Sequence, residues 1–471
     1  MKIKNLVFVT ILFCFVLSNL STATSYQIKN SDLSTFYFNS DIIIPDDYST
    51  IQEGIDAADI GDIIFVRNDI YNEHIVINKT GITLLGEDKY DTIIDGCKGV
   101  DDGIKIKSEN VTIKNLTIKN FKDKQKLDIY SWNQAGIEIH ESNAKIINNY
   151  FVDNGVGLEL FSSIINTTIS DNEMINDSLL IGNYFDRFPS TFPEIAKSSF
   201  VHNIYNNTVN GKPLYYFKDK SNFSAPTDAG QITMVNCSNF SIRDLHMNNN
   251  DFSLILAYCY DGLIENVTIA DTNGETLLFE CENITIQKNT ITNTFKGICL
   301  EYKSKNNVIK NNCFTKNYVG ISLFNSANNN TIYQNEIYDG YGYMGSGIEI
   351  VSYHNGTQKD NNITENHIEN NPVGIHFRQN TINNTIYKNN ITKNLIGIYL
   401  EVSSNDNDIV KNNFRKNIVQ AFFSDCYTNN WNQNYWGKSR ILTKLIYGYR
   451  KIGRFPMPWI NKDSNPLWKA V

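Results

Sequence analysis

Residues 366–400 read NHIENNPVGIHFRQNTINNTIYKNNITKNLIGIYL, and this stretch contains two copies of each of two short phrases. The first phrase, Asn-x-Ile or Asn-x-Phe, recurs along residues 289–414 at intervals of 23, 23, 31, 23 and 23 residues. The second phrase, Gly-Ile-x-Leu or a variant of it, starts at Gly297, Gly320, Gly347, Gly374 and Gly397. The spacings of the two phrases agree on a unit of about 23 residues, interrupted by four-residue insertions near 338–346 and near 352–360.

Each unit consists of short stretches rich in β-branched and aromatic residues, and Asn, Gly and Asp separate these stretches. A unit has no room for the crossover helix of a β–α–β connection. A period near 23 with such short strands therefore predicts an all-β protein, a single-stranded right-handed parallel β-helix with three strands per coil. At the usual spacing between strands, roughly 14 coils would form a rod about 65 Å long.

The repeated asparagine has a structural explanation. Asn tolerates left-handed turn geometry, and its amide both donates and accepts hydrogen bonds, so equivalent Asn residues of successive coils are expected to form a ladder. The many Asn-x-Ser/Thr triplets leave two alternatives open, because an exported glycoprotein and an Asn- and Thr-rich repeat both produce them. These triplets include Asn110, Asn115, Asn266, Asn283 and Asn362.

Residues 1–25 have the pattern of a secretory signal peptide. Lys2 and Lys4 precede a mostly apolar run from Leu6 to Leu17, and small residues follow it. The alternative is an uncleaved anchor, although this run is shorter than the roughly 20 residues that span a bilayer. No later segment approaches membrane length. We therefore expect a secreted protein, in an extracellular, cell-surface or periplasm-like location.

The two ends of the rod are expected to differ from its middle, because an open coil would expose the core and a strand edge. Thr50 and Glu53 form a capping-box pattern ahead of apolar residues at helical spacing. Tryptophan, tyrosine and proline dominate the last segment. The expected organisation is a signal peptide at 1–25, a lead-in and capping helix at 26–60, β-helix repeats at 61–430 with an excursion at about 179–229, and an irregular C-terminal cap at 431–471.

The composition excludes two classes of protein. A content of 41% hydrophobic and 12% aromatic residues is too apolar for a disordered chain. A net charge of −8 excludes a protein that binds a nucleic-acid backbone through its overall field. Outside the predicted leader the chain has seven cysteines, an odd number in a long chain, which argues against a small disulfide scaffold. The sequence does not determine an oligomeric state.

The repeat also aligns side chains on one sheet. In Gly-Ile-x-Leu-x the two variable positions are expected to face solvent, and each forms a column over successive coils. The first column contains Cys299, Ser322, Glu349, His376 and Tyr399, and the second contains Glu301, Phe324, Val351, Arg378 and Glu401.

Five members of these columns are candidate site residues: Glu349, His376, Arg378, Tyr399 and Glu401. Glu, His and Tyr are acid–base groups, an Arg binds a sugar carboxylate through two hydrogen bonds, and a glycosidase uses two carboxylates. They are therefore predicted to bind or to transform a carbohydrate. The alternative is a solvated strand face whose charges only pair across strands.

Two other groups are weaker candidates. An earlier, analogous face carries Glu138, His140 and Glu159, with no cation other than His140. Cys237, Cys259 and Cys281 are 22 residues apart and are expected at equivalent turns of three consecutive coils. They could be small buried corner residues, form one disulfide, or bind a soft ion such as Cu(I).

The chain resembles a known group of β-helix proteins. The phrase TIQEGIDAA at 50–58 with GDIIFV at 61–66 resembles the opening of pectin-lyase-like proteins, and VNGKPLYY at 209–216 and NYWGK at 434–438 are similar to the NosD-type group. That resemblance implies a β-helix that is periplasmic or at the surface and linked to copper-site maturation. The chain lacks a Met-rich or His-rich tract for copper. It also lacks the Gly-His-Gly motif of polygalacturonases and the Gln-Asp-Thr-Leu motif of pectin methylesterases.

We therefore expect an exported β-helix protein of the surface or envelope that binds a polysaccharide or surface glycan near His376, and that is a binding protein rather than an enzyme. The first alternative is a polysaccharide lyase, hydrolase or epimerase acting on the same face. The second is a NosD-like copper accessory protein. No resident cofactor is expected, with copper or calcium as the candidates if there is one.

Overall fold

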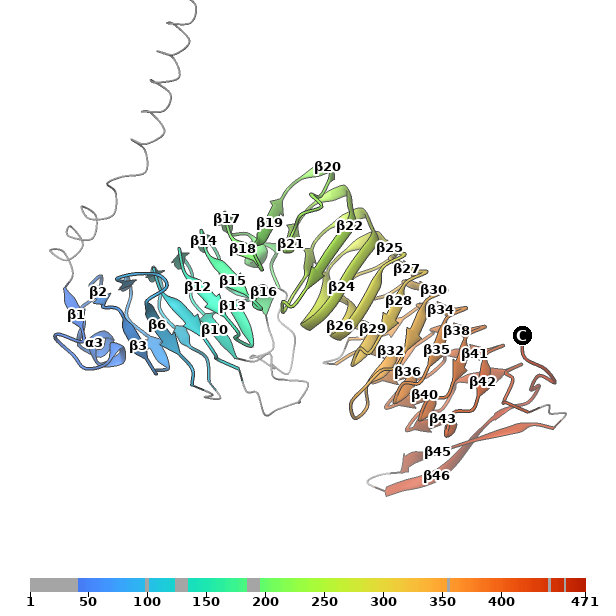
Figure 1. The fold of residues 1–471 in the computed structure, drawn as a ribbon. Coiled ribbons are helices and arrows are strands. Elements are labelled where there is room, and N and C mark those ends of the chain that lie inside the picture. Colours follow the sequence, from blue (N-terminus) through green and yellow to red (C-terminus); the bar gives the residue numbers. More distant parts are fainter. Residues whose placement is uncertain are drawn as a thin grey trace, which may run out of the picture.

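The structure is a computed structural model, which describes residues 41–97, 101–122, 134–183, 195–353, 356–438, 442–452 and 455–471. The predicted signal peptide and lead-in up to residue 40 lie outside them. The chain forms a parallel β-solenoid with about 23 residues per turn, as predicted (Figure 1). The solenoid has about 16 turns. The expectation of 14 coils was too low, because strands within the region predicted to leave the rod also stack on the preceding coils.

Three parallel sheets run along the rod, and most turns contribute one strand segment to each sheet. The first sheet contains β1 (Ile42–Ile44), β2 (Ile63–Val66), β5 (Thr83–Gly86), β8 (Thr112–Lys114), β11 (Lys145–Ile147), β14 (Thr168–Ser170), β17 (Asn203–Tyr205), then β20 (Ser221–Ser224), β25 (Glu282–Gln287), β27 (Val308–Lys310), β30 (Thr331–Tyr333), β34 (Asn362–Thr364), β38 (Thr385–Tyr387), β41 (Asp408–Val410) and β44 (Asn430–Asn432). The second contains β3 (Asp69–Tyr71), β6 (Thr92–Asp95), β9 (Thr117–Lys119), β12 (Tyr150–Val152), β15 (Glu173–Ile175), β18 (Thr208–Val209), then β28 (Cys313–Thr315), β31 (Glu336–Tyr338), β35 (His367–Glu369), β39 (Asn390–Thr392) and β42 (Asn413–Arg415).

The third sheet carries the predicted site. It contains β4 (Ile75–Ile77), β7 (Ile104–Ile106), β10 (Ala135–Ile139), β13 (Val156–Phe161), β16 (Leu179–Asn183), then β19 (Lys212–Lys218), β21 (Gln231–Val235), β23 (Leu254–Ala257), β29 (Val319–Phe324), β32 (Ser346–Val351), β36 (Val373–Arg378), β40 (Ile396–Glu401) and β43 (Val419–Ser424). Three longer strands turn corners and join more than one sheet: β22 (Ser238–Asn248), β24 (Tyr260–Phe279) and β26 (Thr290–Glu301). A small corner sheet pairs β33 (Gln358–Lys359) with β37 (Thr381–Ile382), and η2 (Lys197–Phe200) is one 3₁₀ turn.

The rod has a junction between its two halves. Backbone pairing in the third sheet ends at β16 and resumes with β19 and β21. Side chains connect the two halves of this sheet instead. The Gln231 side-chain oxygen accepts the N–H of Leu179 (3.1 Å), and its amide nitrogen donates to the Leu179 carbonyl (2.6 Å). The Asp251 carboxylate accepts the N–H of Ser178 (2.9 Å). The repeat therefore continues through the junction by side-chain contacts.

The predicted asparagine ladder is present at the coil corners. The side-chain oxygen of Asn389, for example, accepts both the backbone N–H and the amide of Asn366, each at 2.9 Å. The left-handed residue of each such corner is the one before the ladder member: Lys388 has a φ of 55°, whereas Asn389 is not among the residues with positive φ. The Asn is thus selected for its hydrogen bonds, and tolerance of left-handed geometry is not the reason for it.

Interior packing explains the glycine of the second phrase. The Ile and Leu of each Gly-Ile-x-Leu phrase point inward and are fully buried, as in Ile375 and Phe377 of β36. A side chain at Gly297 would place its Cβ 2.5 Å from the carbonyl oxygen of Gly320 on the next coil and 2.7 Å from the Phe314 ring. Glycine is required there because the corner of one coil lies against the next.

The ends differ from the middle. Helix α3 (Ile51–Ala57) begins with the predicted capping box, in which Thr50 accepts the N–H of Glu53 and the Glu53 carboxylate accepts the N–H of Thr50. Its buried face, which includes Ile51 and Ile55, covers the first coils. The C-terminal segment, expected to be irregular, instead contains a long antiparallel hairpin of β45 (Lys444–Ile452) and β46 (Phe455–Asp463).

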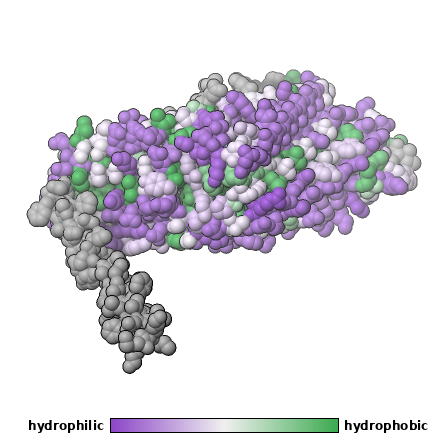
Figure 2. Space-filling model, turned by 90° about the horizontal axis from the view of Figure 1, so that it is seen from above, coloured by the Kyte–Doolittle hydropathy of each residue, from purple (hydrophilic) through white to green (hydrophobic). Residues whose placement is uncertain are grey.

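The outer surface seen in Figure 2 is mostly hydrophilic, with scattered apolar residues. Within the described part of the chain, no helix is long and apolar enough to cross a membrane.

Candidate functional site

The backbone pairing in the third sheet agrees with the predicted columns. Glu349 pairs with His376, which pairs with Tyr399 on the following strand. Arg378 pairs with Glu401 in the second column. The 23-residue spacing and the Gly-Ile phrase therefore predicted which side chains are neighbours on β32, β36 and β40.

The five candidate residues form one contact network. The Arg378 guanidinium donates from Nη1 to Glu349 Oε1 (3.0 Å) and from Nε to Glu401 Oε1 (3.1 Å). The same oxygen of Glu401 bonds His376 Nε2 at 3.1 Å. The His376 and Tyr399 rings are stacked, with centroids 4.9 Å apart. Two carboxylates thus share one guanidinium, and the imidazole of His376 joins the network through Glu401.

The expectation that these columns face solvent is wrong, because seven of their ten members are buried. Among the candidate residues, His376 is fully buried and Glu349 is nearly so, whereas Arg378, Tyr399 and Glu401 are half-buried. Neighbours on successive coils are only about 4.8 Å apart. The Tyr399 ring therefore covers one side of His376, and the Arg378 side chain reaches across to Glu349.

Burial and charge act in opposite directions on Glu401. Burial disfavours the ionised carboxyl, but the hydrogen bond from His376 and the charge of Arg378 outweigh it and hold the pKa of Glu401 below its usual range. Glu401 is therefore ionised at neutral pH, and its carboxylate orients both Arg378 and His376.

Removing the guanidinium is expected to destabilise the protein. The Arg378→Met variant leaves Glu349 and Glu401 without their shared cation, which should lower the free energy of unfolding by about 1–2 kcal/mol, because Arg378 is about one third exposed. Urea unfolding measures this effect. The exposed Arg415→Met is the control and should change stability by less than about 0.5 kcal/mol. Equal effects of the two substitutions would mean that the network contributes nothing to stability.

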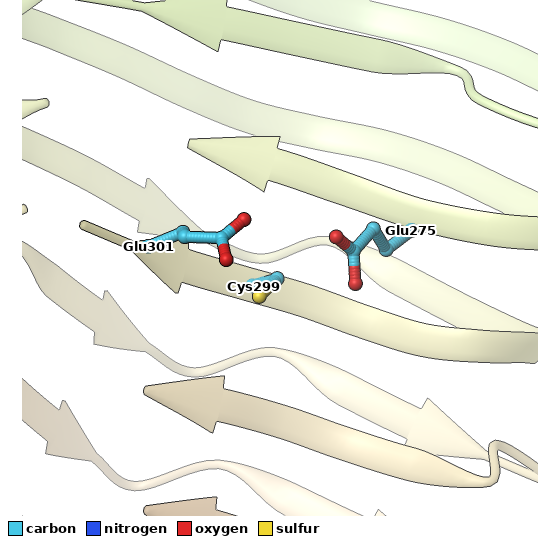
Figure 3. Close-up of side chains that lie close together, drawn as sticks. All are labelled: Glu275, Cys299 and Glu301. Atoms are coloured by element: carbon cyan, nitrogen blue, oxygen red, sulfur yellow. The ribbon is translucent and has the colours of Figure 1, made fainter. Parts of the chain in front are cut away.

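A second cluster lies two coils before this network. Lys296 Nζ is 3.0 Å from Glu275 Oε2 and 3.8 Å from the Cys299 sulfur. One oxygen from each of Glu275 and Glu301 and the Cys299 sulfur all lie within 4.8 Å of one another (Figure 3). All four residues are buried. The sequence placed Cys299 and Glu301 in the two predicted columns of the third sheet. It did not indicate Glu275 or Lys296 as their neighbours, because β24 has a register shift between Thr272 and Thr276.

Glu301 is the unusual member of this cluster. It is 2% exposed, and its carboxyl group forms no hydrogen bond with a described residue. Burial alone raises its pKa to about 8, so the group is predominantly protonated at neutral pH. Burial by itself would lower the pKa of Lys296. The charges of Cys299, Glu275 and Glu349 have the opposite and larger effect, so the pKa is raised and the ammonium stays charged. Lys296 is therefore the cation that balances Glu275.

The earlier face contains a cation that the sequence did not indicate. Lys105 Nζ lies 2.9 Å from an Asp102 oxygen and 3.8 Å from a Glu138 oxygen. His140 Nε2 is 2.8 Å from the same Glu138 oxygen. Burial and the Glu138 charge raise the pKa of Asp102 to about 6. Glu159 pairs with Glu138 in register and is buried. This face is a buried ion network of the first half of the rod.

The three stacked cysteines have contacts of structural corner residues. Cys237, Cys259 and Cys281 are buried free thiols. Each sulfur donates to a backbone carbonyl of the preceding coil, at 3.5, 3.6 and 3.4 Å. The hydrogen bond with Cys259 and burial raise the pKa of Cys237, and burial raises the pKa of Cys259.

These donors do not fit a copper ion. A thiol binds metal as thiolate, and raised pKa values keep the thiols of Cys237 and Cys259 protonated. The cluster around Cys299 offers one protonated thiol and two carboxyl groups, a donor set too hard for Cu(I), and Lys296 already neutralises it. Calcium requires six to eight oxygen ligands, more than Glu275 and Glu301 supply.

Several solved structures are similar in fold, and no curated protein matches the chain. A mutant of the periplasmic alginate epimerase AlgG matches at 12% identity and a TM-score of 0.29, over 83% of this chain and 65% of that chain. The mannuronan C-5 epimerase AlgE4 A-module of Azotobacter vinelandii matches at 15% identity and a TM-score of 0.25, over 76% and 94% of the two chains. An exopolygalacturonase from Thermotoga maritima matches at 8% identity and a TM-score of 0.35, over 86% and 87%.

A family model described as "Periplasmic copper-binding protein (NosD)" matches residues 194–358 and 353–448. These segments cover all the coils of the second half of the rod, including both clusters of the third sheet. Together they span more than half of the sequence, and the chain belongs to the NosD family.

Proposed function

We propose that this protein is exported, that it acts at the cell surface or in the envelope, and that it binds glycans on the third sheet at the C-terminal end of the charged columns. The observation that carries the proposal is a strip of half-buried rings, Tyr399, Phe422 and Tyr449, which continues the His376 column along the rod. Ring centroids are 5.5 Å apart between Tyr399 and Phe422, and 6.3 Å apart between Phe422 and Tyr449.

The strip combines the two kinds of contact that sugars need. An aromatic ring packs against the apolar face of a sugar ring, and charged groups beside it bond the hydroxyl or carboxylate groups. Arg378 and Glu401 lie beside Tyr399 and keep part of their surface accessible. The buried residues His376 and Glu349 then act as positioning residues, because they hold Arg378 and Glu401 through the network.

Binding to a panel of acidic and neutral polysaccharides tests the proposal. Tyr399→Ala is expected to weaken binding by about tenfold or more, the loss typical of one ring–ring contact. Tyr387→Ala is the matched control, since Tyr387 is a half-buried tyrosine on a different sheet, the first, in the same part of the rod. Affinity electrophoresis measures both variants, and thermal unfolding confirms that they are folded.

A polysaccharide lyase, hydrolase or epimerase remains the second candidate, because Glu349 and Glu401 both bond Arg378 and Glu401 also bonds His376. Mass spectrometry of the same polysaccharides after incubation detects it as shorter, unsaturated or epimerised products. Glu401→Gln should then abolish turnover in a protein that still melts cooperatively. An unchanged panel with no binding to any polymer would contradict both candidates.

A further inference from the structure

The C-terminal hairpin differs in charge from the rest of the chain. The whole sequence has a net charge of −8, yet residues 438–471 carry eight basic residues and one acidic residue. The acidic residue, Asp463, is buried and accepts hydrogen bonds from the Asn434 amide and the Trp436 indole, so it offers no charge to a partner. The basic residues are Lys438, Arg440, Lys444, Arg450, Lys451, Arg454, Lys462 and Lys469.

The same segment concentrates exposed apolar side chains. Of the 24 large hydrophobic residues that are exposed in the described parts of the chain, ten lie between Leu442 and Val471. In the hairpin, Phe455 is 74% exposed, Ile452 59% and Trp459 41%. Isolated exposed apolar residues are ordinary on a soluble protein, but a cluster ringed by one sign of charge marks an interaction surface.

The ends of β45 and β46 next to the hairpin turn project past the neighbouring coils (Figure 1). Strand β45 pairs with the last coil only through Gly448 and Tyr449, opposite two residues of β43. Two further contacts tie β45 to that coil: the Lys451 N–H bonds the Asp425 carboxylate (3.2 Å), and the Arg450 guanidinium lies 4.5 Å from the centre of the Tyr427 ring. Beyond them, Ile452 pairs with Phe455 of β46 and no other described strand.

We infer that this hairpin docks the protein on an anionic lipid surface. Ile452, Phe455 and Met457 enter the boundary between headgroups and acyl chains, where Trp459, on the same face of the hairpin, also lies favourably. The described basic residues Arg450, Lys451, Lys462 and Lys469 attract the lipid phosphates, each worth about 1 kcal/mol near the surface. The charge of the segment selects this partner, because the remainder of the chain is strongly acidic and would be repelled. The inference is independent of glycan binding on the third sheet.

Co-sedimentation with vesicles tests the inference, using protein recovered after export. Strong binding is expected to vesicles of phosphatidylcholine mixed with phosphatidylglycerol, weak binding to pure phosphatidylcholine, and loss of binding at high salt. The pair Ile452→Ser with Phe455→Ser should lower binding by at least about tenfold, and so should Arg450→Glu with Lys451→Glu. Ile60→Ser and Lys218→Glu are the matched controls, an exposed apolar residue and an exposed basic residue elsewhere.

Three results would overturn the inference. One is the absence of binding to anionic vesicles by the folded protein. Another is binding that the hairpin variants and the controls reduce equally. The third is self-association of the protein that the hairpin variants abolish while vesicle binding is unchanged, since the hairpin would then contact a second copy of this chain.

Discussion

Replacing Asn389 with alanine is expected to lower the free energy of unfolding by about 3–5 kcal/mol. Asn389 lies in the middle of a ladder of buried amides and makes five side-chain hydrogen bonds. Its oxygen accepts two from Asn366, and its amide donates to the carbonyls of Ile363 (2.9 Å) and Tyr387 (3.3 Å) and to Asn412 (3.0 Å). Alanine leaves the backbone N–H of Asn366 and the Ile363 carbonyl without partners at a site closed to water, and each such group costs about 1–3 kcal/mol.

Urea unfolding followed by circular dichroism measures the loss. Asn390→Ala is the control, because Asn390 is the next residue in the same corner and has no side-chain hydrogen bond recorded among described residues. Its effect should remain below about 0.5 kcal/mol. A loss of the same size in both variants would show that the ladder contributes no more than an ordinary surface asparagine.

The second large effect depends on pH. The Glu301→Gln variant is expected to be about 3–5 kcal/mol more stable than the natural protein at and above pH 8, and about equal to it near pH 4.5. The folded protein keeps the proton on Glu301 up to a pKa of about 8, whereas the unfolded chain releases it near the ordinary value of 4.5. Between these values the unfolded state binds fewer protons, so the natural protein loses stability as the pH rises. Glutamine has no proton to lose.

Unfolding of both proteins across this pH range checks the prediction. The other buried acids with raised pKa values, Asp102, Asp177 and Asp251, are present in both proteins and cancel in the difference. Glu336→Gln is the control, since Glu336 is exposed on the second sheet. A stability difference for Glu301→Gln that does not change with pH would mean that Glu301 is ionised in the folded protein.

The repeat made part of the site predictable. The sequence intervals from Gly347 to Gly374 and from Gly374 to Gly397 determine the register of three strands. The pairing of Glu349 with His376, and of His376 with Tyr399, follows from that register. The capping box at Thr50 and the asparagine ladder were also predictable, because each depends on residues at a fixed spacing.

Other features have no signature at fixed spacing. Lys296 meets Glu275 only because a register shift in β24 moves the glutamate along the sheet. His376 is fully buried, and the Tyr399 ring that stacks on it comes from the next coil. The hairpin could not be recognised as one, because its pairing depends on the last coil and on residues that do not repeat.

The sequence by itself determined the solenoid, its period and the identity of neighbouring side chains, because hydrogen-bonded coils repeat the same local geometry. Only the tertiary structure decided which of those neighbours are buried, which carboxyl groups keep their protons and which end of the rod exposes an apolar, basic surface. Burial and charge are sums over contacts from distant segments, and a local pattern of residues does not contain them.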